Sequence, residues 1–410
     1  MQFRRLLHNR SVTDQEMSLY AGGLTGQRAS GRHIVVAQDT SEVVLGSRQA
    51  RPRFGPVGKG NAAGVLLYAA LAVEAGSNAV LGLVSMQVWN RGREALEPRR
   101  KRATSGKESK RWIESTRRAG EVLAKAASVT MVSDRESDFY ELLVQRPDNV
   151  DLVIRACQNR RIEAVEEAPD LLFDFIDAGG EQGRFVTTIP AAPGRRARNA
   201  ELVVRFAPVI IRRPLHGADK TLPETVKVTL VDVREVSAPE DGSAAVHWRL
   251  LTTHQVASLQ DARRVIGFYR TRWMIEEFFR TLKTAGFDIE SAEIGDPHAM
   301  VNFVAAAAVA AVTIKQLVQA RDGDTDQRLS DAFDPADQPL LAAVSASLEG
   351  KTARQRNPHP RGSLAFAAWV IARLGGWTGY YGKPGPKVMR IGLTEFRAIK
   401  YGANLVLQDV

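Results

Sequence analysis

Short apolar runs separated by helical segments dominate the first 155 residues, and they constrain the fold more than any other feature. These runs lie at residues 33–37, 129–132 and 150–155. The apolar stretch 62–89 breaks at residues 76–78 and predicts two strands joined as a hairpin, although a buried pair of helices would give the same pattern. Helices are expected over about residues 108–127 and around residues 139–143. Strands and helices in this order predict a mixed α/β sheet wrapped by helices.

The chain changes character over residues 162–245, where Gly and Pro become frequent and short runs of alternating polarity appear. Alternation with a period of two is typical of strands, so this segment predicts an all-β insertion. Helical periodicity returns over about residues 259–284 and 297–320 and continues more weakly into the tail. We therefore expect an N-terminal helical segment (1–30), a main α/β domain (31–161 and 246–327), a β insertion (162–245) and a helical C-terminal region for dimerisation (328–410).

The composition is that of a globular protein with an excess of positive charge. The 410 residues are 44% apolar and 25% charged, which excludes wholesale disorder. The one cysteine, Cys157, excludes an internal disulfide, and we expect it to be a small buried apolar residue. The longest apolar run, residues 303–312, is too short for a membrane span, and the N-terminus lacks a signal peptide's apolar core, so we expect a cytoplasmic protein. The formal charge of +10 suits a protein that binds nucleic acid.

Two acidic residues directly follow predicted strands. Asp39 comes after the run HIVVAQ, and Asp134 comes after VTMVS. Because carboxylates at the ends of neighbouring strands can converge above one edge of a sheet, these residues could bind a hard divalent cation. The alternative is that each Asp is a turn or helix N-cap residue, which is the commoner role at this position.

A third set of polar residues lies on the long predicted helix. Tyr269, Arg272 and Lys283 stand at offsets of −7, −4 and +7 from Glu276, and these steps return to nearly the same side of a helix. Cationic side chains on either side of a carboxylate suit the oxygens of a phosphate. The alternative is an exposed ion pair between Arg272 and Glu276, which would contribute only tenths of a kcal/mol. The neighbouring Glu277 points about 100° away around the helix.

These residues resemble the signature motifs of the insertion-sequence-four family of DDE transposases. The family pattern of Tyr, Arg, Glu and Lys, with two, three and six residues between them, is met on the long predicted helix. The stretch DRESDFYELL from Asp134 resembles the second-acid motif, and VVAQDTS around Asp39 resembles the first. RWIESTRRAG and SLAFAAWVIARLGGW are also similar to family sequences, so the resemblance runs from about residue 31 to the C-terminus.

The resemblance implies a ribonuclease H-like mixed sheet, interrupted by the β insertion and followed by a helical C-terminal tail. It implies that Asp39, Asp134 and Glu276 form a catalytic triad that holds two Mg²⁺ ions, which Mn²⁺ can replace. Such an enzyme performs cut-and-paste transposition through strand cleavage, hairpin formation, hairpin opening and strand transfer. The implied partners are double-stranded DNA, as transposon ends and target, and a second copy of the chain in a synaptic complex near the nucleoid, with no membrane.

The resemblance also implies a set of DNA contacts. Tyr269, Arg272 and Lys283 match DNA-contacting positions. Trp248 matches a tryptophan that stacks on a flipped base, although it could instead be a core residue of its strand. Arg155 matches an arginine near the hairpin end of the DNA. The basic segments 99–110 and 195–198 are further candidates for backbone contacts or are solvated loops, and the seven histidines show no metal-ligand spacing.

The N-terminal segment departs from the family pattern. The stretch before Asp39 leaves room for one or two short helices and not for a full DNA-recognition domain, so we expect a shortened N-terminus. Thr13 and Glu16 predict a helix with a capping box, which Gly22 and Gly23 would end. Two alternatives to an active transposase stay open. One is a truncated protein that binds DNA or a longer partner without catalysis, and the other is a ribonuclease H-like structure-specific nuclease.

Overall fold

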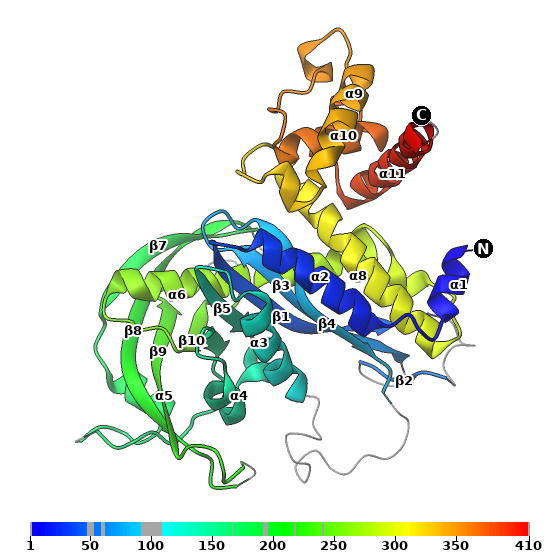
Figure 1. Cartoon of the computed structure of the whole chain (residues 1–410). Helices are drawn as coiled ribbons and strands as arrows, with labels where there is room; N and C mark the ends of the chain where they lie inside the picture. The colour runs from blue at the N-terminus through cyan, green and yellow to red at the C-terminus, as the bar shows by residue number, and fades with distance from the viewer. Residues whose placement is uncertain are drawn as a thin grey trace.

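The computed structural model describes residues 2–46, 53–58, 62–91, 109–165, 167–191, 196–216, 219–239 and 242–408. A ten-stranded mixed sheet forms its centre, helices cover both faces of this sheet, and the C-terminal helices stand to one side (Figure 1). The strand order is β2-β3-β1-β5-β6-β10-β9-β8-β7, and β4 also pairs with β3. The prediction of a mixed α/β sheet with a helical C-terminal region is confirmed.

The first part of the chain supplies the strands predicted for it. They are β1 (His33–Val44), β2 (Gly55–Pro56), β3 (Ala63–Glu74), β4 (Val80–Trp89), β5 (Ser128–Ser133) and β6 (Asp151–Arg155). β3 and β4 form an antiparallel pair, so the predicted hairpin is confirmed over the alternative of two helices. β1 runs parallel to β5, and β5 runs parallel to β6, which brings the carboxyl ends of these three strands to one edge of the sheet.

The segment predicted as a β insertion extends the central sheet. It contains α5 (Leu172–Ala178), β7 (Gly183–Ile189), β8 (Arg198–Arg212) and β9 (Thr225–Glu235). β9 pairs with β10 (His247–Thr252), and β10 pairs in turn with β6, so hydrogen bonding runs on from the first strands into these. Its all-β character is confirmed apart from the short helix α5. The boundaries between domains stay a prediction.

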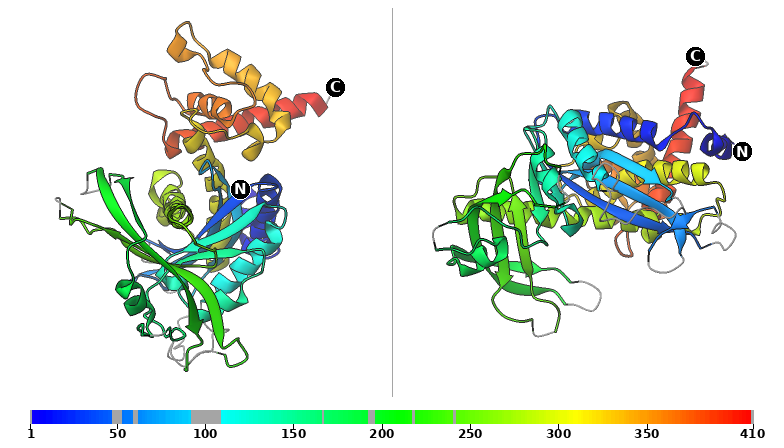
Figure 2. Two further views of the ribbon diagram at one scale, coloured as in Figure 1. Left: turned by 90° about the vertical axis from the view of Figure 1, so that its left-hand side faces the viewer. Right: turned by 90° about the horizontal axis from the view of Figure 1, so that it is seen from below.

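Two hydrophobic cores lie on the two faces of the sheet. The first core is formed mainly with α6 (Leu259–Thr271), α7 (Trp273–Arg280) and α8 (Pro297–Ala320), and the second with α3 (Lys110–Val122), α4 (Tyr140–Gln145) and α5. Figure 2 shows these layers from two further directions. The side chains of β1, β5 and β6 alternate between the two cores, so the face that a residue occupies follows from its position along the strand.

A third core belongs to the C-terminal region. It joins the end of α8 to α9 (Gln338–Leu348), α10 (Leu364–Leu374) and α11 (Pro386–Gln408). Among the described residues, α8 is the one helix long and apolar enough to cross a membrane, but 61% of its most apolar window is buried inside the protein. Buried core helices meet the same criterion, so α8 is weak evidence for a membrane span.

The N-terminal part consists of α1 (Gln2–His8) and α2 (Asp14–Arg28). The capping box of Thr13 and Glu16 is present as predicted. The prediction that glycines 22 and 23 end the helix is wrong, because α2 continues through them to residue 28. A Cβ atom at Gly22 would lie 2.9 Å from the carbonyl oxygen of Val84, so glycine permits α2 to lie directly against β4.

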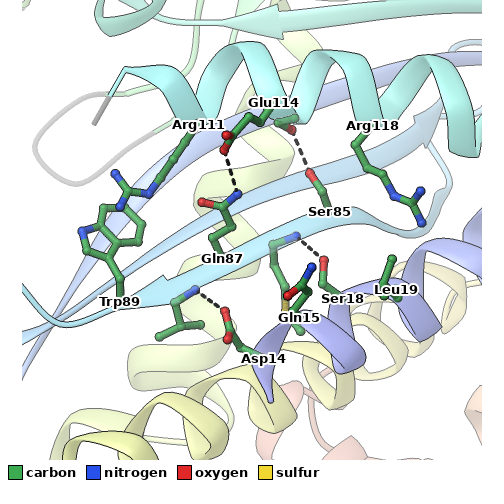
Figure 3. A pocket seen from close by; sticks show the side chains of 13 residues that line it. Asp14, Gln15, Ser18, Leu19, Ser85, Gln87, Trp89, Arg111, Glu114 and Arg118 are labelled. Carbon is green, nitrogen blue, oxygen red and sulfur yellow. Dashed lines mark hydrogen bonds between the residues drawn. The ribbon is translucent and has the colours of Figure 1, made fainter. Parts of the chain in front are cut away.

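Side chains of α2 also satisfy backbone groups of β4 (Figure 3). The backbone N–H of Met86 donates to Ser18 Oγ at 2.9 Å, and that of Val88 donates to Asp14 Oδ2 at 3.0 Å. The groove between α2 and α3 is lined by these residues and by Arg111, which stacks over the ring of Trp89. Among the residues that the structure describes, none of those predicted to act on DNA lines this groove.

Candidate active site

Three parallel strands carry polar side chains to equivalent positions at one edge of the sheet. Ala37, Val132 and Val153 occupy neighbouring positions in β1, β5 and β6. Asp39, Asp134 and Arg155 each follow one of these residues by two positions along the chain. Because side chains two residues apart share a face, all three belong to the face that α6 and α7 cover. The prediction that the two aspartates belong to neighbouring strands is confirmed, and Asp134 directly follows β5 as expected. The prediction that Asp39 ends its strand is wrong, because β1 continues past Asp39 to Val44.

The helix that crosses this face is interrupted. α6 ends at Thr271, α7 begins at Trp273, and Arg272 joins them. The hydroxyl of Thr271 donates to the carbonyl of Gly267 at 3.3 Å, and such bonding of a Thr side chain to its own helix favours a bend. A five-residue π-helical turn (Thr281–Ala285) follows α7. The prediction of one regular α-helix over about residues 259–284 is therefore wrong in detail.

Arg272 lies between two of the predicted acids. Its Nη2 donates to Glu276 Oε1 at 2.6 Å, and its Nη1 lies 3.5 Å from Asp39 Oδ2. The Arg272 side chain is 14% exposed, so these contacts are shielded from water more than an ordinary surface ion pair. Arg272 thus brings Asp39 and Glu276 together as the counter-ion of both carboxylates.

Asp134 belongs to a second group of contacts at the same edge. The hydroxyl of Tyr269 donates to Asp134 Oδ1 at 3.3 Å, and Arg155 Nη1 lies 3.8 Å from the same oxygen. The ring of Trp248 meets that of Tyr269 edge to face, with centroids 5.4 Å apart. Asp134 precedes a 3-10 turn, but its side chain makes no capping hydrogen bond, so the carboxylate is not used as an N-cap.

Lys283 lies in the π-helical turn and pairs with an acid that the sequence analysis missed. Its Nζ is 3.5 Å from Glu290 Oε1, which also accepts a hydrogen bond from the backbone N–H of Val44 at 3.1 Å. Lys283 is therefore held near the end of β1, the strand that carries Asp39. No sequence motif pointed to Glu290, because its role depends on the fold of residues 286–291.

Asp39 is held in a largely buried environment. Burial is the main reason why the pKa of Asp39 is raised to about 6; the Thr40 N–H and Arg272 oppose this rise, and the charges of Glu136 and Glu276 add smaller increases. Burial also raises the pKa of Tyr269, as does the charge of Asp134. Glu136 was not singled out from the sequence, although its position two residues after Asp134 was the signal that could have found it.

The residues at this edge fit a divalent cation in their chemistry. Asp39, Asp134 and Glu276 offer the oxygen ligands that Mg²⁺ and Mn²⁺ prefer. Burial is the main cause of the raised pKa of Asp39, and a bound cation would favour the charged form that burial disfavours. In the part of the chain that the structure describes, however, no three His, Cys, Asp or Glu side chains are close enough to hold one metal ion together. The donor types therefore suit a hard cation, and in this arrangement Arg272 is the counter-ion of Asp39 and Glu276.

Several other predictions have mixed outcomes. Most of the basic segment 99–110 lies outside the described residues, as does Arg195. Arg198 forms an ion pair with Glu235 at 2.5 Å. The expectation that Cys157 is buried is wrong, because the residue is exposed in the loop after β6.

Comparison with known families adds one finding. A family model described as the transposase DDE domain matches residues 79–313 of this chain, more than half of its length. The matched span begins after Asp39 and contains every other predicted site residue, which are Asp134, Arg155, Trp248, Tyr269, Arg272, Glu276 and Lys283. The mixed sheet, its helices and the C-terminal helical region agree with the ribonuclease H-like fold of this family.

Proposed function

This chain belongs to the transposase DDE-domain family, and we propose that it catalyses cut-and-paste transposition with Asp39, Asp134 and Glu276 as its catalytic acids. Membership of the family makes it a transposase, an enzyme class that cleaves and transfers DNA strands. The observation that carries the assignment of residues is the shared edge of the sheet. Asp39 and Asp134 follow paired positions of parallel strands, and Arg272 links Asp39 to Glu276.

The proposed cofactor is a pair of Mg²⁺ ions, with Mn²⁺ as a substitute. Asp39, Asp134 and Glu276 would hold them. Bound ions of this kind activate an attacking oxygen and stabilise the leaving oxygen of a phosphodiester. The burial of Asp39 supports this proposal, because a bound cation stabilises the charged carboxylate that burial disfavours.

Arg272, Lys283 and Tyr269 would hold the DNA phosphates beside the acids. A phosphate oxygen competes well for a guanidinium, because charge-assisted bidentate bonds of Arg to phosphate are strong. When DNA enters, Arg272 would exchange its carboxylate partners for a phosphate, which frees Asp39 and Glu276 to act as ligands. The position of Arg272 beside both Asp39 and Glu276 supports this exchange, because a phosphate near these acids would lie within reach of its guanidinium.

The reaction would proceed as a series of phosphoryl transfers. Water attacks one strand and frees a 3′-hydroxyl, this hydroxyl attacks the opposite strand to form a hairpin, a second water opens the hairpin, and the 3′-hydroxyl finally attacks target DNA. Trp248 would stack on a base flipped out of the tight hairpin, and its neighbour Tyr269 supports this placement of an aromatic ring next to Asp134. Arg155 would contact the DNA near the same point.

The working assembly would be a dimer on paired transposon ends, joined through the region 328–410. Apolar side chains that remain exposed on α11 support this proposal, and the clearest are Ile399, Tyr401 and Leu405, at 38%, 68% and 47% exposure. The motif set favours the insertion-sequence-four subfamily within the larger family. The formal charge of +10 supports DNA as the partner.

The direct test is Mn²⁺-dependent nicking of supercoiled plasmid by Asp39→Asn and Asp134→Asn variants. Each substitution should abolish nicking while DNA binding, measured by filter retention, stays within about twofold of wild type. Asp151→Asn is the matched control, because Asp151 is a half-exposed carboxylate at the opposite end of β6. Nicking at the wild-type rate by either of the first two variants would end the assignment of the triad.

A further inference from the structure

Asp138 is a buried carboxylate close to the site but outside the set of predicted catalytic residues. The residue is 3% exposed, and its side chain is fully enclosed. It lies at the end of the loop that follows β5, four residues after Asp134. Buried carboxylates are costly unless hydrogen bonds and a cation compensate the charge, so the contacts of Asp138 indicate what its charge is used for.

Those contacts all come from the loop that follows β6. Asp138 Oδ2 accepts hydrogen bonds from the backbone N–H groups of Cys157, at 2.7 Å, and Gln158, at 3.0 Å. Its Oδ1 pairs with the guanidinium of Arg160, which is itself 8% exposed and also donates to the Asp138 carbonyl at 2.5 Å. The amide of Gln158 donates to the same carbonyl at 2.9 Å. One side chain therefore fastens two loops that leave neighbouring parallel strands.

The two loops carry two residues of the proposed site. The first loop begins with Asp134, and its carbonyl accepts hydrogen bonds from the Ser137 hydroxyl at 2.8 Å and the Ser137 N–H at 3.1 Å. The second loop begins after Arg155, whose guanidinium lies 3.8 Å from Asp134 Oδ1. Two features therefore fix the distance between Asp134 and Arg155. The first is the pairing of β5 with β6, and the second is the set of bonds from Asp138 to the loop after β6.

We propose that Asp138 is a positioning residue for DNA cleavage, acting through its bonds to Cys157, Gln158 and Arg160 to fix Asp134 against Arg155 and Tyr269. This inference rests on the proposed catalytic role of Asp134. The side chain of Asp138 is fully enclosed by protein, so this role needs no contact of Asp138 with DNA or a cation. Its carboxylate fixes the turn after β5, and this turn then fixes the orientation of the Asp134 carboxylate at the edge of the sheet.

The test compares Asp138→Asn with Asp134→Asn and with a matched control. Asparagine keeps the shape of Asp138 but loses the charge and turns an NH₂ group toward groups that are themselves donors. We expect kcat for Mn²⁺-dependent plasmid nicking to fall roughly 10- to 100-fold, since displacement of a reacting group by about 1 Å can have such an effect. The Kd for DNA should stay within about twofold, because Asp138 makes no contact with DNA.

The matched control is Asp331→Asn in the C-terminal region. Asp331 has a 3% exposed side chain, pairs with Arg32 at 3.0 Å and accepts a backbone N–H from Arg328 at 2.9 Å. The Asp331→Asn variant should lose as much thermal stability as the Asp138→Asn variant, and its kcat for nicking should stay at the wild-type value. If Asp138→Asn does not fold, Arg160→Lys serves in its place, because an ammonium keeps the charge but cannot reproduce the planar, two-pronged geometry of a guanidinium.

Three results are distinguishable. An inactive Asp134→Asn variant, a slowed Asp138→Asn or Arg160→Lys variant and a normal Asp331→Asn variant support the proposal. Wild-type kcat in folded Asp138→Asn or Arg160→Lys, together with an inactive Asp134→Asn variant, overturns the positioning role and leaves the proposed function standing. Full nicking by Asp134→Asn overturns the proposed function itself, and with it the role of Asp138.

Discussion

Two adjacent glutamates on α7 should separate catalysis from stability. Glu276 has a 34% exposed side chain and pairs with Arg272 at the proposed site. Glu277 faces away from it and pairs at 3.1 Å with Lys315, a lysine of α8 whose side chain is 8% exposed. Glu276→Gln and Glu277→Gln make the same chemical change one residue apart, so each is the control for the other.

The expected loss of stability in each variant follows from how deeply its ion pair is buried. Removing one partner of a buried ion pair typically costs about 3–5 kcal/mol, because the other charge stays buried without compensation. Glu277 is 25% exposed and shares its charge with Arg280, so we expect a smaller loss of about 2–3 kcal/mol in the free energy of unfolding. For Glu276→Gln we expect a smaller change, below about 1 kcal/mol, because Arg272 keeps Asp39 as a partner, but a fall in DNA nicking of at least about 100-fold.

Chemical unfolding and Mn²⁺-dependent nicking of plasmid DNA at 20 °C, where every variant is folded, measure the two effects separately. Lys315→Met in the Glu277→Gln background should recover part of the lost stability, because the double variant no longer buries an unpaired ammonium. Normal nicking by Glu276→Gln would refute the assignment of the third acid. Loss of nicking by folded Glu277→Gln would show that the wrong glutamate of the pair was chosen.

Three further predictions concern the aromatic residue, the cation and a buried histidine. Trp248→Ala should leave first-strand nicking unchanged and slow hairpin formation on pre-nicked duplexes by roughly 5- to 150-fold, the equivalent of about 1–3 kcal/mol of base stacking. Equal hairpin yields from the variant and the wild type on denaturing gels would remove the stacking role. Chelation by EDTA should stop nicking, and added Mg²⁺ or Mn²⁺ should restore it, so nicking in EDTA would contradict a metal-dependent mechanism. Burial lowers the pKa of His254 below its ordinary 6.5. The imidazole therefore takes up a proton more readily in the unfolded chain than in the folded one. The free energy of unfolding should fall as the pH drops below about 6.5, by up to about 1.4 kcal/mol per pH unit. His254→Gln should flatten this part of the stability curve, and an unchanged slope in urea unfolding would contradict it.

The sequence was most informative where periodicity and chemistry coincide. The strand that leads to Asp39 and the one that leads to Asp134 were predicted because buried parallel strands have continuous apolar runs. The α8 helix was predicted with its observed bounds, since its Ala-rich pattern begins at a Pro and ends where polar residues resume. Gly22 misled the analysis because its use is close packing against β4, and close packing depends on contacts between distant segments.

Other features of the site depend on tertiary structure and left no mark in the local pattern. The break at Arg272 and the π-helical turn around Lys283 come from how residues 267–287 pack, and helical spacing alone treats them as one regular helix. The charge of Glu136 on Asp39 and the bonds from Asp138 to the loop after β6 join segments by three-dimensional contact. Motif spacing could name the acids, but not the neighbours that orient them.

The most direct test of the central claim is the position of Mn²⁺ in a crystal of the full chain bound to DNA. Anomalous scattering should locate Mn²⁺ bound by carboxylate oxygens of Asp39, Asp134 and Glu276, with the guanidinium of Arg272 moved from Glu276 to a DNA phosphate. Mn²⁺ bound elsewhere on the chain, with Arg272 still paired to Glu276 in the presence of DNA, would contradict the account.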